Sequence, residues 1–262
     1  MTPATSLVLT VTEPRILAHM VMKNEENRFL DACLAWNSQW FDQIHVYDDR
    51  STDNSVKIAL KYTKLLGIHP EGAVEFFEHE GQFRQLAWDN MKELCDLEDG
   101  DWVFGLDADE FLVGTEREPN PVVGLRMLME RGEIVKKKSA SIVRQEIWDT
   151  TGSVLHNRVD GFWSADRPAR FVRWEPNGQI KDAKLGCGSV PEYGLRETIN
   201  DIHVCSLLHF GYSVEGEAQR KFDLYSSVVG DLHNPNHIRS IVETPTLGDW
   251  NGPTPKWWRG VK

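Results

Sequence analysis

Apolar and polar positions in residues 15–115 follow two different periods. Short apolar runs predict strands, and segments with apolar residues at every third or fourth position predict helices. Strands are expected at Ile16–Met22, Ile44–Asp48, Val74–Phe77 and Trp102–Leu106, and helices at Glu25–Phe41, from about Asp53, and at Gln82–Cys95. Strands that alternate with helices through short connections predict a parallel sheet wrapped by helices. In such sheets ligands bind beyond the carboxyl ends of the strands.

The second half of the chain has a less regular pattern, interrupted by loops rich in glycine and proline. Its expected helices are Pro121–Glu130 and Glu215–Val229, and its expected strands are Ala140–Trp148, Ala169–Trp174 and Ile202–Phe210. The sequence contains no internal repeat and no low-complexity linker. We therefore expect one α/β domain over residues 1–262.

The composition indicates a globular, acidic protein. Its 262 residues are 40% apolar and 26% charged, enough to bury a core. The net charge of −11 is unfavourable for nucleic-acid binding over most of the surface. The cysteines lie far apart, as expected for reduced thiols in a cytoplasmic protein. We expect no secretory signal, and no apolar run approaches the ~20 residues that span a bilayer.

Asp107 and Asp109 follow directly after the apolar strand Trp102–Leu106. Residues i and i+2 of an extended segment point the same way, so both carboxylates can face one point. Two converging carboxylates repel each other, which makes them unfavourable for stability alone. They suit Mg²⁺ or Mn²⁺, which prefer oxygen ligands and share them with phosphate. The alternative is a solvated turn with a helix-capping aspartate.

Polar clusters follow two other expected strands, at Lys23–Glu26 and Tyr47–Ser55. Part of the second cluster is a strand-to-helix turn, in which Asp53 is expected to cap the helix. Asp48 and Asp49 are not needed for capping. A carboxylate there could accept a hydrogen bond from a nucleobase or a ribose hydroxyl.

Together these motifs resemble glycosyltransferase family 2 and its relatives of the GT-A fold. The matching segments are Lys-Asn-Glu-Glu at 23–26, Asp-Asp-x-Ser-Thr-Asp-x-Ser at 48–55 and Asp-Trp-Val-Phe-Gly-Leu-Asp-Ala-Asp-Glu-Phe at 101–111. They occur in the family's order over about residues 15–115. Arg50 departs from the pattern, because the family usually has glycine at that position.

The resemblance implies a GT-A-type, mostly parallel central sheet flanked by helices. Residues 15–115 would form a Rossmann-like half that binds a nucleotide sugar. Residues 116–230 would form the half that binds the acceptor and completes the metal site, and residues 231–262 would form a C-terminal tail.

The resemblance also implies roles for individual residues. Asp107 would approach the ribose or the metal, and Asp109 would bind the metal. Arg84 stands where relatives place a basic or amide residue near the diphosphate, although an exposed helix arginine is the alternative. The residues expected to line the nucleotide pocket are Asn24, Glu25 and Asp49.

A histidine in the second half is a further candidate metal ligand. The segment Leu207–Tyr212, followed by a helix that contains Gln219-Arg220-Lys221-Phe222, looks like one that recurs in relatives. In GT-A enzymes a late histidine often completes the metal site. We therefore expect His209 to bind the metal, with a buried core histidine as the alternative. Three arginines around one expected strand could meet phosphate or an anionic acceptor: Arg167, Arg170 and Arg173.

The sequence thus predicts a glycosyltransferase that requires Mn²⁺ or Mg²⁺ and a nucleotide-diphosphate sugar, with a UDP-sugar favoured. The acceptor hydroxyl is unidentified and belongs to a glycan, a protein or a modified nucleobase. The resemblance implies inversion, which needs a general base. Asp166 is the candidate, with Asp160 and Glu192 as substitutes and a loop salt bridge as the alternative interpretation.

Two other functions remain open. A nucleotidyltransferase also holds Mg²⁺ with carboxylates on a parallel sheet, but it normally has a glycine-rich phosphate loop, and Ile16–Arg28 contains no glycine. A non-catalytic module that binds a nucleotide sugar or a carbohydrate is the second.

Overall fold

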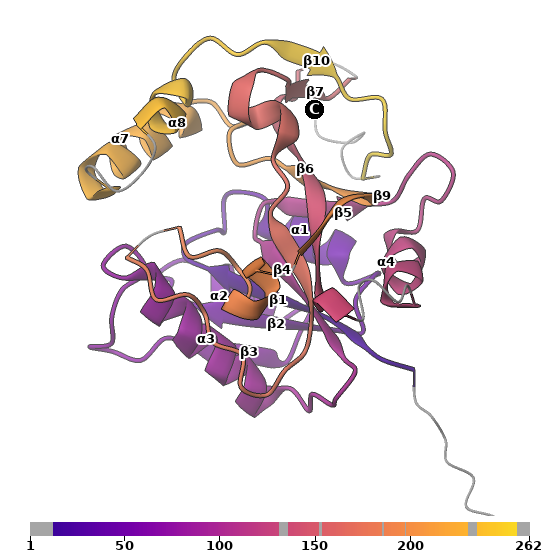
Figure 1. The fold of residues 1–262 in the computed structure, drawn as a ribbon. Coiled ribbons are helices and arrows are strands. Elements are labelled where there is room, and N and C mark those ends of the chain that lie inside the picture. Colours follow the sequence, from indigo (N-terminus) through magenta and orange to yellow (C-terminus); the bar gives the residue numbers. More distant parts are fainter. Residues whose placement is uncertain are drawn as a thin grey trace, which may run out of the picture.

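The computed structural model describes residues 13–130, 136–151, 154–184, 186–196, 198–229 and 235–255 (Figure 1). Within them, the strands are β1 (Ile16–Met22), β2 (Gln43–Asp48), β3 (Leu65–Ile68), β4 (Trp102–Asp107), β5 (Glu110–Val113), β6 (Ser139–Asp149), β7 (His156–Arg158), β8 (Ala169–Arg173), β9 (Thr198–His209) and β10 (Leu247–Asp249). The helices are α1 (Leu30–Asn37), α2 (Ser55–Ala59), α3 (Glu80–Leu94), α4 (Pro121–Glu130), the 3-10 helix η1 (Gly161–Ala165), α6 (Glu192–Arg196), α7 (Glu217–Val229) and α8 (Pro235–Ser240).

These strands form one mixed sheet in the order β10-β7-β6-β8-β4-β1-β2-β3, and β9 pairs with β5 and β6. The neighbours β3, β2, β1 and β4 are parallel, and β8 continues the sheet antiparallel to β4. The expected α/β fold with a parallel centre flanked by helices is therefore confirmed. The same sheet includes strands from both halves of the sequence.

Strand β1 lies between β4 and β2 in the parallel part of this sheet and is buried on both faces. Ile16, Ala18 and Met20 pack into the apolar cluster that contains buried residues of α1, α2 and α4. Leu17 points to the opposite face, where it packs with Trp88 of α3. This alternation follows from the two-residue period of a strand, and it explains why β1 is apolar almost throughout.

The third strand differs from the sequence prediction. Val74–Phe77 was expected to be a strand, but it forms no strand, and β3 is formed by Leu65–Ile68. Gly67 interrupts the apolar pattern of β3, which hides it from a periodicity argument. Its lack of a side chain is required, because a Cβ there would lie 2.9 Å from the Tyr47 ring and still closer to Asn90.

The first two helices also begin later than expected. Residues 26–29 form turns before α1 begins at Leu30, and the backbone N–H of Glu25 donates to Ser55 Oγ at 2.7 Å. Asp53 is not the cap of α2. Its carboxylate accepts a hydrogen bond from the backbone N–H of Ser55 at 2.9 Å, and Asn54 occupies the cap position.

Strand β5, which the sequence pattern did not predict, determines the position of His209, the candidate metal ligand. It pairs antiparallel with β9, and its register places Glu110 opposite His209. The Phe210 N–H also donates to the Asp109 carbonyl at 3.0 Å. This pairing brings the late histidine beside the motif that ends β4.

Helix α7 belongs to a second part of the molecule. Figure 1 shows α7 and α8 at the upper left of the view, with α2 and α3 in the lower part. An aromatic cluster of Trp148, Trp163 and Tyr212 packs against the α7 residues Phe222 and Tyr225. This cluster fixes α7 beside the end of β9.

No helix in the described part of the chain is long and apolar enough to cross a membrane.

Candidate functional site

A cavity of about 760 Å³ opens at the carboxyl ends of β1, β2 and β4, and α7 and Ile238 of α8 close it on the other side. Its lining includes all of the donor- and metal-site residues predicted from the sequence, namely Asn24, Glu25, Asp49, Arg84, Asp107, Asp109 and His209. The predicted base Asp166 and its substitutes Asp160 and Glu192 are not among the lining residues.

The first two motifs hold each other in place at the cavity edge. Asn24 adopts a left-handed backbone with φ of 53°, and its side-chain oxygen accepts the Thr52 N–H at 2.8 Å. Asp48 accepts the Ser51 N–H at 2.9 Å, so its carboxylate is used within the turn. The neighbouring Asp49 is therefore the carboxylate of this pair that reaches the cavity.

Asp49 has one carboxylate oxygen without a hydrogen bond. Its Oδ2 binds Lys23 Nζ at 3.0 Å, while its buried Oδ1 accepts no hydrogen bond and lies 3.9 Å from Arg50 Nε. A buried acceptor without a donor is costly, which favours a ligand N–H or O–H at this position.

Arg50, where the resembling family usually has glycine, adopts φ of 54°. Glycine adopts this conformation without steric strain, whereas arginine is strained there. Arg50 Nη2 binds Glu75 at 2.8 Å, which contributes to holding the turn.

Arg84 is not an exposed helix arginine. Its side chain is only 12% exposed, and its Nε binds Glu80 Oε1 at 2.7 Å within α3. Glu80 Oε2 in turn accepts the Gly186 N–H at 2.5 Å, which joins α3 to a glycine-rich loop. Arg84 lines the cavity near Asp107, where it can meet an anionic ligand.

Asp107 is ionised and partly accessible. Burial raises its pKa, but the charges of Arg170 and Arg84 outweigh this and hold the pKa well below its usual range. Arg170 binds Asp107 Oδ2 at 2.7 Å and Glu110 Oε1 at 2.6 Å. Of the three arginines near β8, Arg170 therefore forms ion pairs with two carboxylates of the motif.

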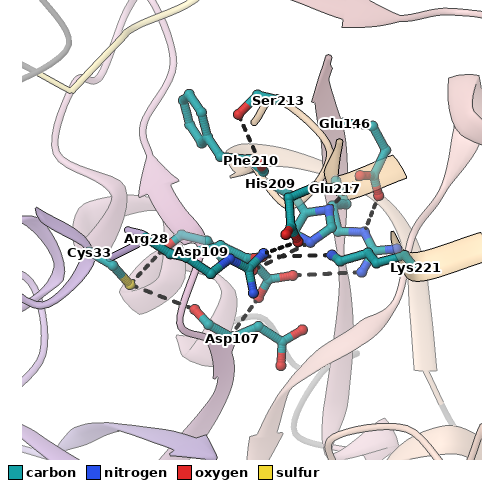
Figure 2. Close-up of polar contacts among 12 residues, drawn as sticks. Arg28, Cys33, Asp107, Asp109, Glu146, His209, Phe210, Ser213, Glu217 and Lys221 are labelled. Atoms are coloured by element: carbon teal, nitrogen blue, oxygen red, sulfur yellow. Dashed lines mark hydrogen bonds and ion pairs between the residues drawn. The ribbon is translucent and has the colours of Figure 1, made fainter. Parts of the chain in front are cut away.

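Asp109 is surrounded by three cationic side chains (Figure 2). Its carboxylate lies 3.4 Å from His209 Nε2, 3.5 Å from Arg28 Nη2 and 3.9 Å from Lys221 Nζ. Burial raises the pKa of Asp109, but these charges outweigh it and hold the pKa well below its usual range.

His209 is oriented from behind by a buried carboxylate. Its Nδ1 forms a short contact with Glu146, which is fully buried, so Nε2 faces Asp109. Burial lowers the pKa of His209, but the charges of Glu146 and Asp109 outweigh it and raise the pKa to about 9. Without a metal, His209 is therefore a cation at neutral pH.

Asp166 lies behind this group rather than in the cavity. Its carboxylate binds Arg144 Nη2 at 2.5 Å, and Arg144 Nε lies 2.8 Å from Glu146. Arg144 lines the cavity and separates Asp166 from it. This is the salt bridge that the sequence left open as the alternative interpretation.

The residues present fit a hard divalent cation. Asp107 and Asp109 are ionised oxygen donors on one edge, and the Asp107 side chain is 31% exposed. The described residues contain no group of three or more metal-binding side chains already gathered around one point. His209, Arg28 and Lys221 already face the Asp109 carboxylate, so a divalent cation could bind there only if these cationic neighbours moved.

Two further groups of cavity residues were not assigned from the sequence. Arg28 bridges Glu25, Asp109 and Glu217, and it gave no distinctive local signal. Helix α7 contributes Glu217, Arg220, Lys221 and Leu224. Their spacing of three and four residues places them on one helix face, which is a signal that the sequence does contain.

Glu25 has an unusual carboxyl group. Its Oε1 binds Arg28 Nη1 at 3.0 Å, but its buried Oε2 has no hydrogen-bond partner. Burial raises its pKa to about 7, against the opposing charge of Arg28.

Comparisons with known proteins give distant likenesses. No protein-family model matches the sequence, and no curated protein matches it. Similar solved structures include S. aureus TarS, at 12% identity and a TM-score of 0.43, with 87% of this chain and 42% of that chain covered. TarS 1–349 in complex with UDP gives 11% identity and a TM-score of 0.46, with 87% and 69% covered.

A third similar structure is 4-diphosphocytidyl-2C-methyl-D-erythritol synthase, at 13% identity and a TM-score of 0.37, with 62% of this chain and 76% of that chain covered. The present chain spans less than half the length of the first TarS structure.

Proposed function

We propose that this chain is a glycosyltransferase that requires a divalent cation and takes its sugar from a nucleotide-diphosphate donor. The observation that carries the proposal is the gathering of all three sequence motifs around one cavity. Residues from the ends of β1, β2 and β4 line it together with Arg84 and His209. Its volume of about 760 Å³ lies in the range of small-molecule sites, roughly 300–1,000 Å³.

In this proposal the two ends of the cavity bind the two ends of the donor. Asp49 Oδ1 would accept a hydrogen bond from the base or the ribose. Asn24 and Phe76 line the same cavity. Arg84, fixed by Glu80, would bind the diphosphate oxygens.

The reaction requires charge stabilisation where the sugar–phosphate bond breaks. The leaving diphosphate gains negative charge, and fixed positive groups lower the energy of that state. Asp107 and Asp109, with His209, would hold Mg²⁺ or Mn²⁺, which when bound neutralises part of this charge. Glu146 would keep His209 Nε2 directed toward the site, and Asp107 would stay aligned through Arg170.

Inversion would need a base within reach of the acceptor hydroxyl. Asp166 is the candidate from the sequence, but Arg144 stands between it and the cavity. Glu25 lines the cavity, has a free Oε2 and has a pKa of about 7, which suits a general base. We propose Glu25 as the second candidate, and Glu25→Gln should then lower kcat more than Asp166→Asn does.

Two measurements test the function. Thermal shift with UDP-, GDP-, CMP- and dTDP-sugars in Mn²⁺ should single out one nucleotide, because a ligand stabilises the fold that binds it. Donor hydrolysis or transfer by the wild type should then fall about 10²–10³-fold in Asp109→Asn. Full activity in excess EDTA would contradict the metal requirement.

Binding and hydrolysis of nucleotide sugars, with a nucleoside triphosphate as an added substrate, separate the alternative functions. A nucleotidyltransferase would release pyrophosphate from a nucleoside triphosphate, and a non-catalytic module would bind a nucleotide sugar without hydrolysing it. NMR of the product anomer decides between inversion and retention.

A further inference from the structure

Lys221 of α7 occupies a position between two weak partners. Its Nζ lies 3.9 Å from Asp109 Oδ2, the outer limit of an ion pair, and 4.5 Å from the centre of the Tyr212 ring. The side chain is only 12% exposed. The ammonium is thus largely removed from water but is not held by a close hydrogen bond in either direction.

The backbone beside Lys221 leaves room for this arrangement. A Cβ on Gly211 would lie 2.5 Å from His209 Nε2 and 2.8 Å from Asp109 Oδ2, and it would also collide with Lys221 Nζ. A larger residue at this position would push these three side-chain ends apart, so glycine favours the close approach of the carboxylate, the imidazole and the ammonium.

These cations face the carboxylate that is proposed to bind the metal ion. Asp109 is one of the carboxylates proposed to bind the metal, yet His209, Arg28 and Lys221 already face it. Like charges repel, so the ammonium and a divalent cation compete for the same carboxylate. Of these three neighbours, Lys221 lies farthest from the carboxylate in the contacts above, and it has the Tyr212 ring as a second partner.

A diphosphate in the cavity would be a new anionic partner for the displaced Lys221 ammonium. Lys221 is a lining residue, as are Asp107 and Arg84 on the facing side. A diphosphate bound near Asp107 and Arg84 would bring negative charge into the space that α7 covers.

We propose that Lys221 is an internal counter-ion of Asp109, which exchanges with the divalent cation and then binds the donor's diphosphate. The inference rests on the proposed function. It assigns Lys221 two opposite effects: the ammonium weakens binding of the metal alone and strengthens binding of the nucleotide with its metal. A salt bridge that only fastens α7 would have neither effect.

The experiment compares Lys221→Met with Lys221→Arg, which keeps the charge. Methionine has similar length, and its soft sulfur is a poor ligand for Mn²⁺. Lys61→Met is the matched control, because Lys61 pairs with Asp31 on the surface and does not line the cavity. Binding of Mn²⁺ alone is followed by electron paramagnetic resonance, and binding of UDP in saturating Mn²⁺ by calorimetry.

Lys221→Met should bind Mn²⁺ alone about 5- to 10-fold more tightly than the wild type and bind UDP with Mn²⁺ about tenfold more weakly, in the usual range of coupling between two sites. Lys221→Arg and Lys61→Met should stay close to the wild type in both titrations. Asp109→Asn should remove Mn²⁺ binding in the wild-type and Lys221→Met backgrounds alike.

Failure of the inference differs from failure of the proposed function. If the wild type binds Mn²⁺ and UDP but Lys221→Met changes neither affinity, or changes both in the same direction, the exchange is contradicted and the function stands. If the wild type binds neither Mn²⁺ nor UDP, both are contradicted. Melting temperatures show whether the variants are folded, and a lower melting temperature with unchanged affinities identifies a purely structural lysine.

Discussion

Two buried histidines beneath α3 make the fold sensitive to acid. His19 of β1 and His45 of β2 are aligned in register and are 5% and 0% exposed. Their Nδ1 atoms lie 2.9 Å apart, and His45 Nε2 lies 3.0 Å from Asn90 Oδ1. The Asn90 oxygen accepts the Nε2 proton, so Nδ1 of neutral His45 accepts from His19. Protonating both rings would place two donors and two charges against each other.

The size of the effect follows from the pKa of His45. Burial lowers it from 6.5 to about 4. The pKa of His19 is also well below its usual value because of burial and, to a smaller extent, the positive charges of His45 and Arg84. Between pH 6.5 and pH 4, His45 binds a proton in the unfolded chain but not in the folded chain. The free energy of unfolding therefore falls as the pH falls below about 6.5. For His45 the loss by pH 4 corresponds to about 3 kcal/mol, at about 1.4 kcal/mol for each pH unit.

Urea unfolding at pH 7.5, 6.0 and 5.0 measures this loss in the wild type and in His45→Gln. The variant should lose clearly less stability over that range. The comparison between wild type and variant is needed because burial raises the pKa values of Glu25 and Glu110 to about 7. These two carboxyl groups therefore stabilise the fold as the pH falls, which offsets part of the loss from the histidines. His203→Gln, which removes an exposed histidine, should behave like the wild type. Equal losses in wild type and His45→Gln would refute the argument.

Three further changes test the site and its support. Asp49→Ala should weaken UDP binding about 10- to 100-fold in calorimetry, since it removes an acceptor for a ligand hydrogen bond, and an unchanged titration would remove Asp49 from the donor site. His209→Ala should weaken Mn²⁺ affinity about 10- to 100-fold with a smaller effect on Tm, whereas a much lower Tm with normal Mn²⁺ binding would identify a core histidine. Gly81→Ala should destabilise the fold by about 1–3 kcal/mol in urea unfolding, because its Cβ would lie 2.5 Å from the Lys181 carbonyl oxygen, and an unchanged midpoint would contradict this contact.

Local patterns in the sequence determined three of the four parallel strands and the helix α3, whereas β3 was placed wrongly. The apolar runs of β1, β2 and β4 and the helical period of α3 are properties of neighbouring residues, so they can be read without a structure. The three motifs then follow strand ends, and parallel strands bring their carboxyl ends to one edge. The resemblance to a known family added the expected role of each motif.

The tertiary structure decided which side chains share the cavity and in what charge state. His209 meets Asp109 because β5 pairs with β9, which joins segments almost a hundred residues apart through backbone hydrogen bonds. Asp49 rather than Asp48 reaches the cavity because the turn uses Asp48. Asp166 lies behind Arg144, and Lys221 reaches Asp109 because aromatic packing fixes α7 above the site. These contacts depend on pairing and packing between distant segments, and local periodicity carries no information about them.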